Sequence, residues 1–270
     1  MTIIFGSIGY TILKKQDKKI IIFADMHSTL TKCTNIIQIA DWFKTKFTSS
    51  KILLEEVNRD NVNLTELWSD SDHTQHLKQL YLDNPHIIQA IDIRPELIPF
   101  SWELDIDNFI TLKQYLQLID KFFCLHQFSF YDKIPDYNRN KIPHTKLGKH
   151  FLKIKHKYRD YLLKYKNIIN YKLTTLIATN IKCMNYINKI LNNIMEWYVC
   201  ACIYFYSQKS IIIHTGLVHS EHIVNWLTSH YDFEVVRGNG INKMNELDYT
   251  MINGCVELPD YLDTQFGGHN

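Results

Sequence analysis

The sequence predicts an α/β protein with a central, largely parallel β-sheet, flanked by helices and carrying a large all-helical insertion. Continuous apolar runs at 19–25, 52–57 and 211–214 are typical of buried parallel strands. Segments with helical spacing of apolar residues follow these runs, which gives the strand–helix alternation of α/β proteins. Between about residues 105 and 208 the strand pattern gives way to helical spacing. We therefore predict one domain over 1–270 with a helical insertion at about 105–208.

The individual elements follow from the same periodicities. In the first part of the chain, the patterns predict strands at 2–13 and 19–25, a helix within 29–47, a strand at 52–57, one or two helices within 64–82, and a strand at 87–93. In the remainder, they predict a helix at 108–127, a loop at 128–145, two long helices within 147–206, a strand at 211–214, a helix at 219–230, a strand at 233–237, a turn at 238–240 and a last strand within 251–258.

Composition and charge bound the class of protein. The chain has 270 residues, 46% of them hydrophobic, as expected of a globular protein with a sizeable core. The formal net charge of +2 implies no obligate polyanionic partner. Asn, Ile, Lys and Tyr are abundant, which we attribute to mutational bias in an AT-rich genome and not to function.

The cysteines and the apolar segments bear on location. None of the six cysteines forms a CxxC pair or shows zinc-ligand spacing, so we expect ordinary reduced thiols in an intracellular, cytoplasmic protein. The N-terminus lacks the basic region and cleavage site of a signal peptide. The most apolar late run, 194–206, is shorter than the ~20 residues that span a bilayer and contains Glu196. We predict no transmembrane segment.

Polar side chains follow three of the predicted strands. Ligands and catalytic groups collect at the carboxyl ends of parallel strands, so residues that are far apart in the sequence are expected to meet there. The candidates are Asp25, His27, Glu55, His214, Gly216 and His219. Glu56 is adjacent to Glu55 and points to the opposite face of its strand, so it is expected to pair elsewhere, for example with Arg59.

Each candidate has a role that its chemistry suggests. His27 and His219 are candidates for a metal ligand or a general base, because the unperturbed pKa of histidine lies near neutrality. Gly216 would let the backbone approach a ligand. His214 is expected either to contact the substrate or to point into the sheet. Arg94 is expected either to bind an anionic group of the substrate or to pair with Asp92 or Glu96.

The order and spacing of these residues resemble a superfamily that contains TraB/PrgY and TIKI-type metalloproteases, ChaN-like haem-binding proteins and erythromycin-esterase-like hydrolases. The matching segments are Ala24-Asp25-Met26-His27, Leu53-Leu54-Glu55 and Gly216-Leu217-Val218-His219. The family usually has Gly where Ala24 stands and often Glu where Asp25 stands. The resemblance implies a hydrolase of peptidase or esterase type that activates water with His27, Glu55 and His219.

The resemblance leaves the need for a metal open. Two histidines and a carboxylate suit Mn²⁺, Co²⁺ or Zn²⁺, with His27, Glu55 and His219 as ligands. The same groups also suit metal-free catalysis, in which a histidine base activates water and Glu55 orients it. Asp25 would support either mechanism.

Two other functions compete with hydrolysis. The first is a non-catalytic haem or metal carrier on the same scaffold. The second is a nucleic-acid binder, because residues 139–172 hold eleven Lys and Arg against one Asp, with tyrosines interleaved. An amphipathic helix that turns Phe151, Ile154 and Tyr158 toward the core explains this stretch as well. We therefore expect a small-molecule or peptide substrate and regard a nucleic-acid partner as the weaker alternative.

Overall fold

The structure is a computed structural model that describes residues 2–57, 71–97, 111–124, 129–134, 142, 145–248 and 252–266. The chain divides into two compact units. The first comprises Met1–Glu56, Asn63–Ile91 and Tyr206–Asn270, and the second comprises Val57–Val62 and Asp92–Phe205.

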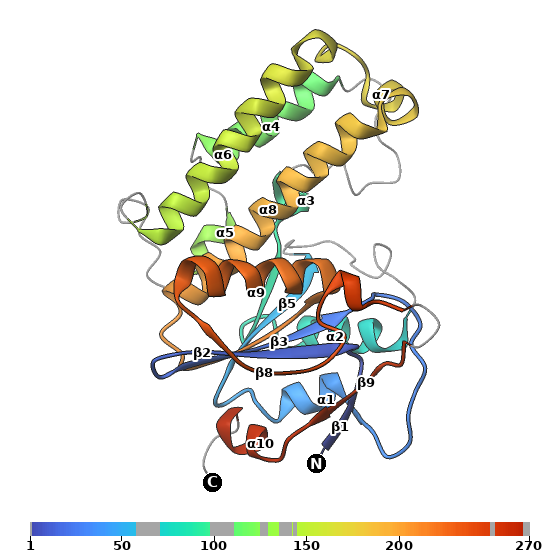
Figure 1. The fold of residues 1–270 in the computed structure, drawn as a ribbon, viewed down its shortest axis with the longest axis vertical. Helices are drawn as coiled ribbons and strands as arrows, with labels where there is room; N and C mark the ends of the chain where they lie inside the picture. Colours follow the sequence, from blue (N-terminus) through green and yellow to red (C-terminus); the bar gives the residue numbers. More distant parts are fainter. Residues whose placement is uncertain are drawn as a thin grey trace. The chain divides into compact units, whose positions relative to one another are not determined.

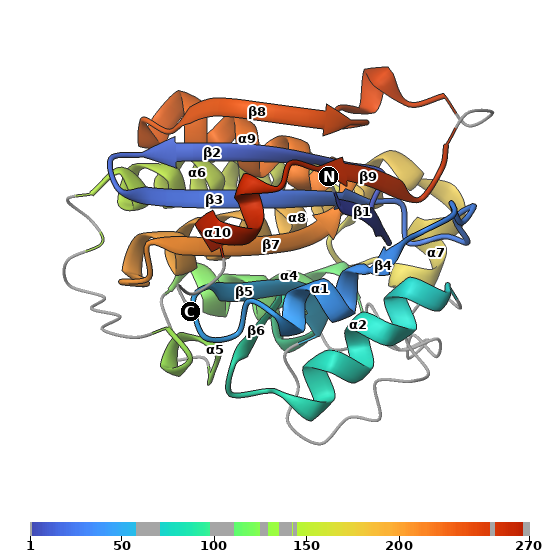
Figure 2. The ribbon, with the colours of Figure 1, turned by 90° about the horizontal axis from the view of Figure 1, so that it is seen from below.

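A six-stranded mixed sheet forms the centre of the first unit (Figure 2). In spatial order its strands are β6 (Ile88–Asp92), β5 (Lys51–Val57), β7 (Ser210–Gly216), β3 (Lys18–Asp25), β2 (Gly9–Lys15) and β8 (Glu234–Gly240). β5, β7 and β3 run parallel, whereas β2 is antiparallel to both β3 and β8. The α/β class is confirmed. The prediction of a largely parallel sheet is wrong on the β2 side, because the tight turn after Lys15 returns the chain as a hairpin.

The predicted strand at 2–13 is two strands in two sheets. β1 (Thr2–Phe5) pairs with β4 (Ile37–Gln38) and β9 (Cys255–Leu258) in a separate three-stranded sheet. The chain breaks at Gly6, whose φ of 110° lies in the region that favours glycine. A Cβ on Gly6 would also lie 2.6 Å from Cγ2 of Ile39. A side chain at this position would therefore be strained and crowded.

Residues 29–47 contain much less helix than predicted. Only α1 (Ile39–Lys44) is helical, and the chain before it pairs with β1 through β4. Cys33 forms a disulfide with Cys255, which ties this segment to β9 across 222 residues of sequence. The prediction of reduced thiols is wrong for this pair. Reduced cysteines therefore no longer support the predicted intracellular location.

Helices cover both faces of the central sheet. α9 (Leu217–Tyr231) lies on one face, and α1 and α10 (Tyr261–Phe266) lie on the other (Figure 1). The isoleucine runs 20–22 and 211–213 are at most 1% exposed, as predicted for buried strands. α2 (Asp72–Asp83) is the described part of the predicted helical segment at 64–82. The predicted turn at 238–240 is instead the end of β8.

The secondary structure described in the second unit is helical, apart from the end residues of β5 and β6 and a bridge between Thr111 and Lys172. The helices are α3 (Arg94–Leu97), α4 (Leu112–Phe123), α5 (Ser129–Asp132), α6 (Lys146–Tyr165), a 3-10 helix (Lys166–Ile168), α7 (Leu173–Thr179) and α8 (Ile181–Phe205). α6 and α8 run side by side (Figure 1). That this block is an insertion into the α/β domain stays a prediction.

The basic stretch within 139–172 forms the amphipathic helix α6. Phe151, Ile154 and Tyr158 are buried, as the core interpretation predicts. Phe151 packs against Trp197 of α8, with ring centroids 5.3 Å apart. The tyrosine and phenylalanine residues on this face are therefore explained by packing. Among the helices that the structure describes, none has the length and apolar character needed to cross a membrane.

Candidate active site

The strand register brings the predicted site residues to one edge of the sheet. Asp25 of β3 is opposite Gly216 of β7, and Leu54 of β5 is opposite His214 of β7. Because these strands are parallel, their carboxyl ends meet at the same edge. Asp25, Glu55 and Gly216 therefore come together, although up to 191 residues separate them in the sequence.

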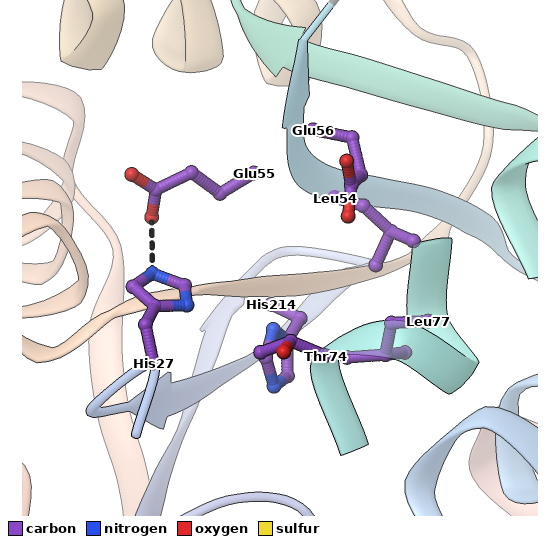
Figure 3. Close-up of a pocket in the computed structure, with 7 residues that line it drawn as sticks. All are labelled: His27, Leu54, Glu55, Glu56, Thr74, Leu77 and His214. Carbon is purple, nitrogen blue, oxygen red and sulfur yellow. Dashed lines mark hydrogen bonds and ion pairs between the residues drawn. The ribbon is translucent and has the colours of Figure 1, made fainter. Parts of the chain in front are cut away.

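His27 lies between two carboxylates just beyond the end of β3. Its Nδ1 is 3.1 Å from Oδ2 of Asp25. Its Nε2 is 3.4 Å from Oε2 of Glu55, and Figure 3 shows this second contact. The φ of His27 is 50°, in the left-handed region that a residue with a side chain rarely adopts. Such conformations persist where the surrounding structure holds them, and they cluster at functional sites. The backbone at His27 therefore marks this position independently of its ring.

Glu55 joins the two halves of the site. Its Oε2 accepts a hydrogen bond of 2.6 Å from the backbone N–H of Gly216, and its Oε1 is 3.5 Å from Nε2 of His219. Gly216 is the N-cap of α9, whose partial positive charge stabilises a carboxylate there. One buried carboxylate thus contacts His27 and His219, which lie on segments far apart in the sequence.

The contacts fix the charges of Asp25 and His27. Burial alone would raise the pKa of Asp25, but its contacts with His27 and His73 outweigh burial and hold that pKa well below its usual range. Burial alone would lower the pKa of His27, but Asp25 and Glu55 outweigh it and raise that pKa well above its usual value. At neutral pH the pair is a carboxylate beside an imidazolium.

His214 is held inside the sheet. It lies within β7, not at its end as predicted, and its Nε2 is 3.0 Å from the carbonyl oxygen of Gly6. Burial lowers its pKa to about 4, so the ring is neutral at pH 7 and Nε2 donates to that carbonyl. Its ring also meets the edge of Phe43. His214 therefore bonds to the backbone of Gly6 and also lines a small pocket.

A small pocket lies beside these groups (Figure 3). It is lined by His27, Leu54, Glu55, Glu56, Thr74, Leu77 and His214. Figure 3 shows Glu55 pointing toward His27, while Glu56 lies beside Leu54. The pocket therefore wraps around the end of β5, and both adjacent glutamates line it, contrary to the expectation that only Glu55 would. Lys78 is an electrostatic neighbour of Glu56. Arg59, the partner suggested by the sequence, lies outside the described residues.

His73, in the first turn of α2, is a further member of this cluster that was not predicted from the sequence. It is 1% exposed, and its Nε2 is 2.9 Å from Oδ1 of Asp25. Helical spacing places His73 on the same face as Leu77 and Leu80, both of which are buried. That periodicity is the signal in the sequence that could have identified His73, which lies within the helical segment predicted at 64–82.

Arg94 belongs to the second unit, where it forms the pairing that the sequence left open. Its Nε and Nη2 donate to the two carboxylate oxygens of Asp92, at 2.7 and 2.9 Å. Its Nη1 donates to Oδ1 of Asn192 at 2.7 Å. The pairing with Asp92 is confirmed, and these contacts account for the guanidinium without a substrate.

The predicted metal ligands are close together but do not form a preorganised metal site. Within the described ranges, no group of three or more His, Cys, Asp or Glu side chains is arranged to hold a metal ion. Glu55 contacts both His27 and His219. The donor set is that of a Zn²⁺ or Mn²⁺ site, whereas its arrangement is a chain in which each histidine contacts a carboxylate.

Comparisons with protein-family models, with curated proteins and with solved structures find no match to this chain. The resemblance to the TraB/PrgY–TIKI, ChaN-like and erythromycin-esterase-like superfamily therefore stays a prediction.

Proposed function

We propose that the protein is a hydrolase whose reaction centre consists of His27, Glu55 and His219, with Asp25 in support. One observation carries the proposal. Asp25, His27, Glu55 and His219 form a continuous chain of carboxylate–histidine contacts of 3.1, 3.4 and 3.5 Å beside a pocket. Alternating acids and bases at the carboxyl edge of a sheet are the groups that proton transfer to and from a substrate needs.

The charges suggest how the roles divide. His27 is held as an imidazolium, so it is suited to stabilise a developing oxyanion or to give its proton to a leaving group. Glu55 and His219 form the second pair, which is suited to accept a proton from water. The hydroxide adds to the carbonyl carbon, the bond to the leaving group breaks, and the proton from His27 neutralises that group. The proton taken from water then returns to His27 through Glu55.

The pocket suggests the kind of substrate. Leu54 and Leu77 provide an apolar wall, and Thr74 provides a hydroxyl group. A small ester or a peptide with an apolar side chain next to the scissile carbonyl fits such a lining.

The test is a hydrolysis assay with His27→Asn. Asparagine tolerates the left-handed backbone that this position requires, so the variant is expected to fold. Wild-type protein is assayed on a panel of p-nitrophenyl esters and fluorogenic peptides, and kcat/KM of His27→Asn is expected to fall about 10²–10⁴-fold. His76→Asn is the matched control, because His76 is about half exposed on α2. Equal hydrolysis by wild type and His27→Asn would contradict the proposal.

A metal-dependent form of the same centre is a second candidate, favoured by the donor set. His27, Glu55 and His219 would hold the ion, and a bound Zn²⁺ would lower the pKa of water. Elemental analysis and titration with Mn²⁺, Co²⁺ and Zn²⁺ test it, with His27→Asn beside the wild type. Stoichiometric metal in the wild type that is lost in the variant supports this form, and activity that persists after metal removal contradicts it.

Gly216→Ala probes the packing of the centre. A Cβ at this position would lie 3.0 Å from Nε2 of His27 and 3.5 Å from Oε2 of Glu55, so the His27 ring must shift. Misplacement of a reacting group by a fraction of an ångström to 1 Å costs up to about 10²-fold, so kcat/KM is expected to fall about 10–100-fold. The φ of −57° suits alanine, so the free energy of unfolding is expected to change by less than about 1 kcal/mol.

The Gly216→Ala measurement has its control on the same sheet. Gly238→Ala, on exposed β8, places its Cβ no closer than 3.4 Å to another atom and is expected to keep wild-type activity. Wild-type kcat/KM in Gly216→Ala would show that the space left beside His27 by the absence of a Cβ on Gly216 has no role in the reaction.

A further inference from the structure

We propose that His73 is a positioning residue of this centre, which holds the Asp25 carboxylate in the orientation that turns Oδ2 toward His27. This inference rests on the proposed function, because it assigns His73 a role through Asp25 and His27. In the described part of the chain, His73 bonds to Asp25 and is not itself part of the pocket lining.

The hydrogen bonds of Asp25 define its orientation. A carboxylate only accepts hydrogen bonds, so Nε2 of His73 carries the proton and donates to Oδ1 at 2.9 Å. The backbone N–H of Met26 donates to the same oxygen at 2.7 Å. With two donors on Oδ1, the carboxylate plane is fixed and Oδ2 is left facing Nδ1 of His27 at 3.1 Å.

The contact between Asp25 and His27 depends on this second anchor. Nδ1 of His27 lies 3.1 Å from Oδ2 of Asp25, so the strength of this contact depends on where the carboxylate plane is held. The 2.9 Å bond from His73 is fully buried and holds Oδ1, the oxygen that does not face His27. His73 is the side chain that prevents Asp25 from rotating away from His27.

His73 is itself held firmly. It lies in the first turn of α2 and is 1% exposed. Its ring packs edge-on against Phe5, with centroids 5.9 Å apart. A Cβ on Gly6 would lie 3.1 Å from Cβ of His73, so only glycine leaves this room. The ring thus has one place, from which its Nε2 reaches Asp25.

The burial of a polar ring here also needs an explanation. Packing against Phe5 alone could be served by an apolar side chain, and a buried polar group is unfavourable unless it is hydrogen-bonded. Within the described residues, Nδ1 of His73 has no hydrogen-bond partner. The bond from Nε2 to Asp25 is therefore the interaction that accounts for a histidine at this position.

Two amide variants separate positioning from packing. In His73→Gln the side-chain N–H reaches about as far as Nε2 does, whereas in His73→Asn it falls short of Asp25. With p-nitrophenyl acetate as the probe, kcat of His73→Asn is expected to fall about 10–100-fold with KM changed less than about threefold. The kcat of His73→Gln is expected to be at least about tenfold higher than that of His73→Asn. His76→Gln, exposed on the same helix, is the control.

A second readout does not need activity. NMR of protein with ¹⁵N-labelled histidine follows the exchange of the His27 ring protons with water. Exchange is expected to be at least about tenfold faster in His73→Asn than in the wild type, and close to wild type in His73→Gln. Equal kcat in the two variants, or equal exchange in all three proteins, would overturn the proposal. If the wild type hydrolyses nothing, the proposed function fails, and the exchange rates still decide whether His73 positions Asp25.

Discussion

Glu55→Gln is expected to lower kcat/KM for hydrolysis by about 10³-fold, a loss as severe as that expected of His27→Asn. Glu55 is the group that both histidines contact, and it accepts the backbone N–H of Gly216. A glutamine removes the charge. Its one oxygen can serve only part of these donors, and its NH₂ group must then face another N–H.

The measurement is kcat/KM with the best ester or peptide of the panel, alongside the free energy of unfolding from urea titration. Glu257→Gln, at an exposed position of β9, is the control for loss of a carboxylate and is expected to match the wild type. Full activity of folded Glu55→Gln would show that Glu55 is a structural cap of α9 and no part of the reaction.

Asp25→Asn is expected to lower the free energy of unfolding at pH 5–7 by about 2–4 kcal/mol and to reduce kcat/KM as well. Asp25 is 1% exposed and accepts from Met26 and His73 while facing His27. In the variant these donors face the neutral asparagine amide. Its oxygen can still accept a hydrogen bond, but its NH₂ group is itself a donor. Urea unfolding of the wild type and the variant measures the difference.

The stability difference is expected to depend on pH with a defined sign. The pKa of His27 is raised in the folded state, so its contribution is fully present below about pH 6.5 and is lost as pH rises through the folded value. The pKa of Asp25 is lowered, so its contribution is present above about pH 4 and is lost as pH falls through its folded value. The gap between the wild type and Asp25→Asn should therefore be widest between about pH 4 and 6.5 and narrow as pH rises to 9. A gap that is constant or widens toward pH 9 would show that Asp25 does not stabilise a charged His27.

The sequence was sufficient to predict the parts of the fold that depend on local pattern. The runs at 20–22, 52–54 and 211–213 are continuous apolar segments, and they form the buried parallel strands. Because the carboxyl ends of parallel strands share an edge, the meeting of Asp25, Glu55 and Gly216 could be predicted too. The contact of His219 with Glu55 followed from its place in the first turn of α9.

The remaining features depend on partners that are distant in the sequence. The disulfide joins Cys33 to Cys255, and the sequence around each cysteine does not indicate this pairing. β4 forms where helical spacing predicted a helix, because its partner β1 supplies the hydrogen bonds. His73 contacts Asp25 across 48 residues. A local pattern could place His73 on a buried helix face but could not show which group that face meets.

A double-mutant cycle tests most directly whether the two distant segments form one reaction centre. His27→Asn, His219→Asn and the double variant are compared with the wild type in kcat/KM, using the best ester or peptide of the panel. Groups that act as a unit lose activity non-additively, so the double variant is expected to lose little more than the more damaged single variant. Losses that multiply in the double variant, or single variants that keep wild-type activity, would contradict a shared centre built on His27, Glu55 and His219.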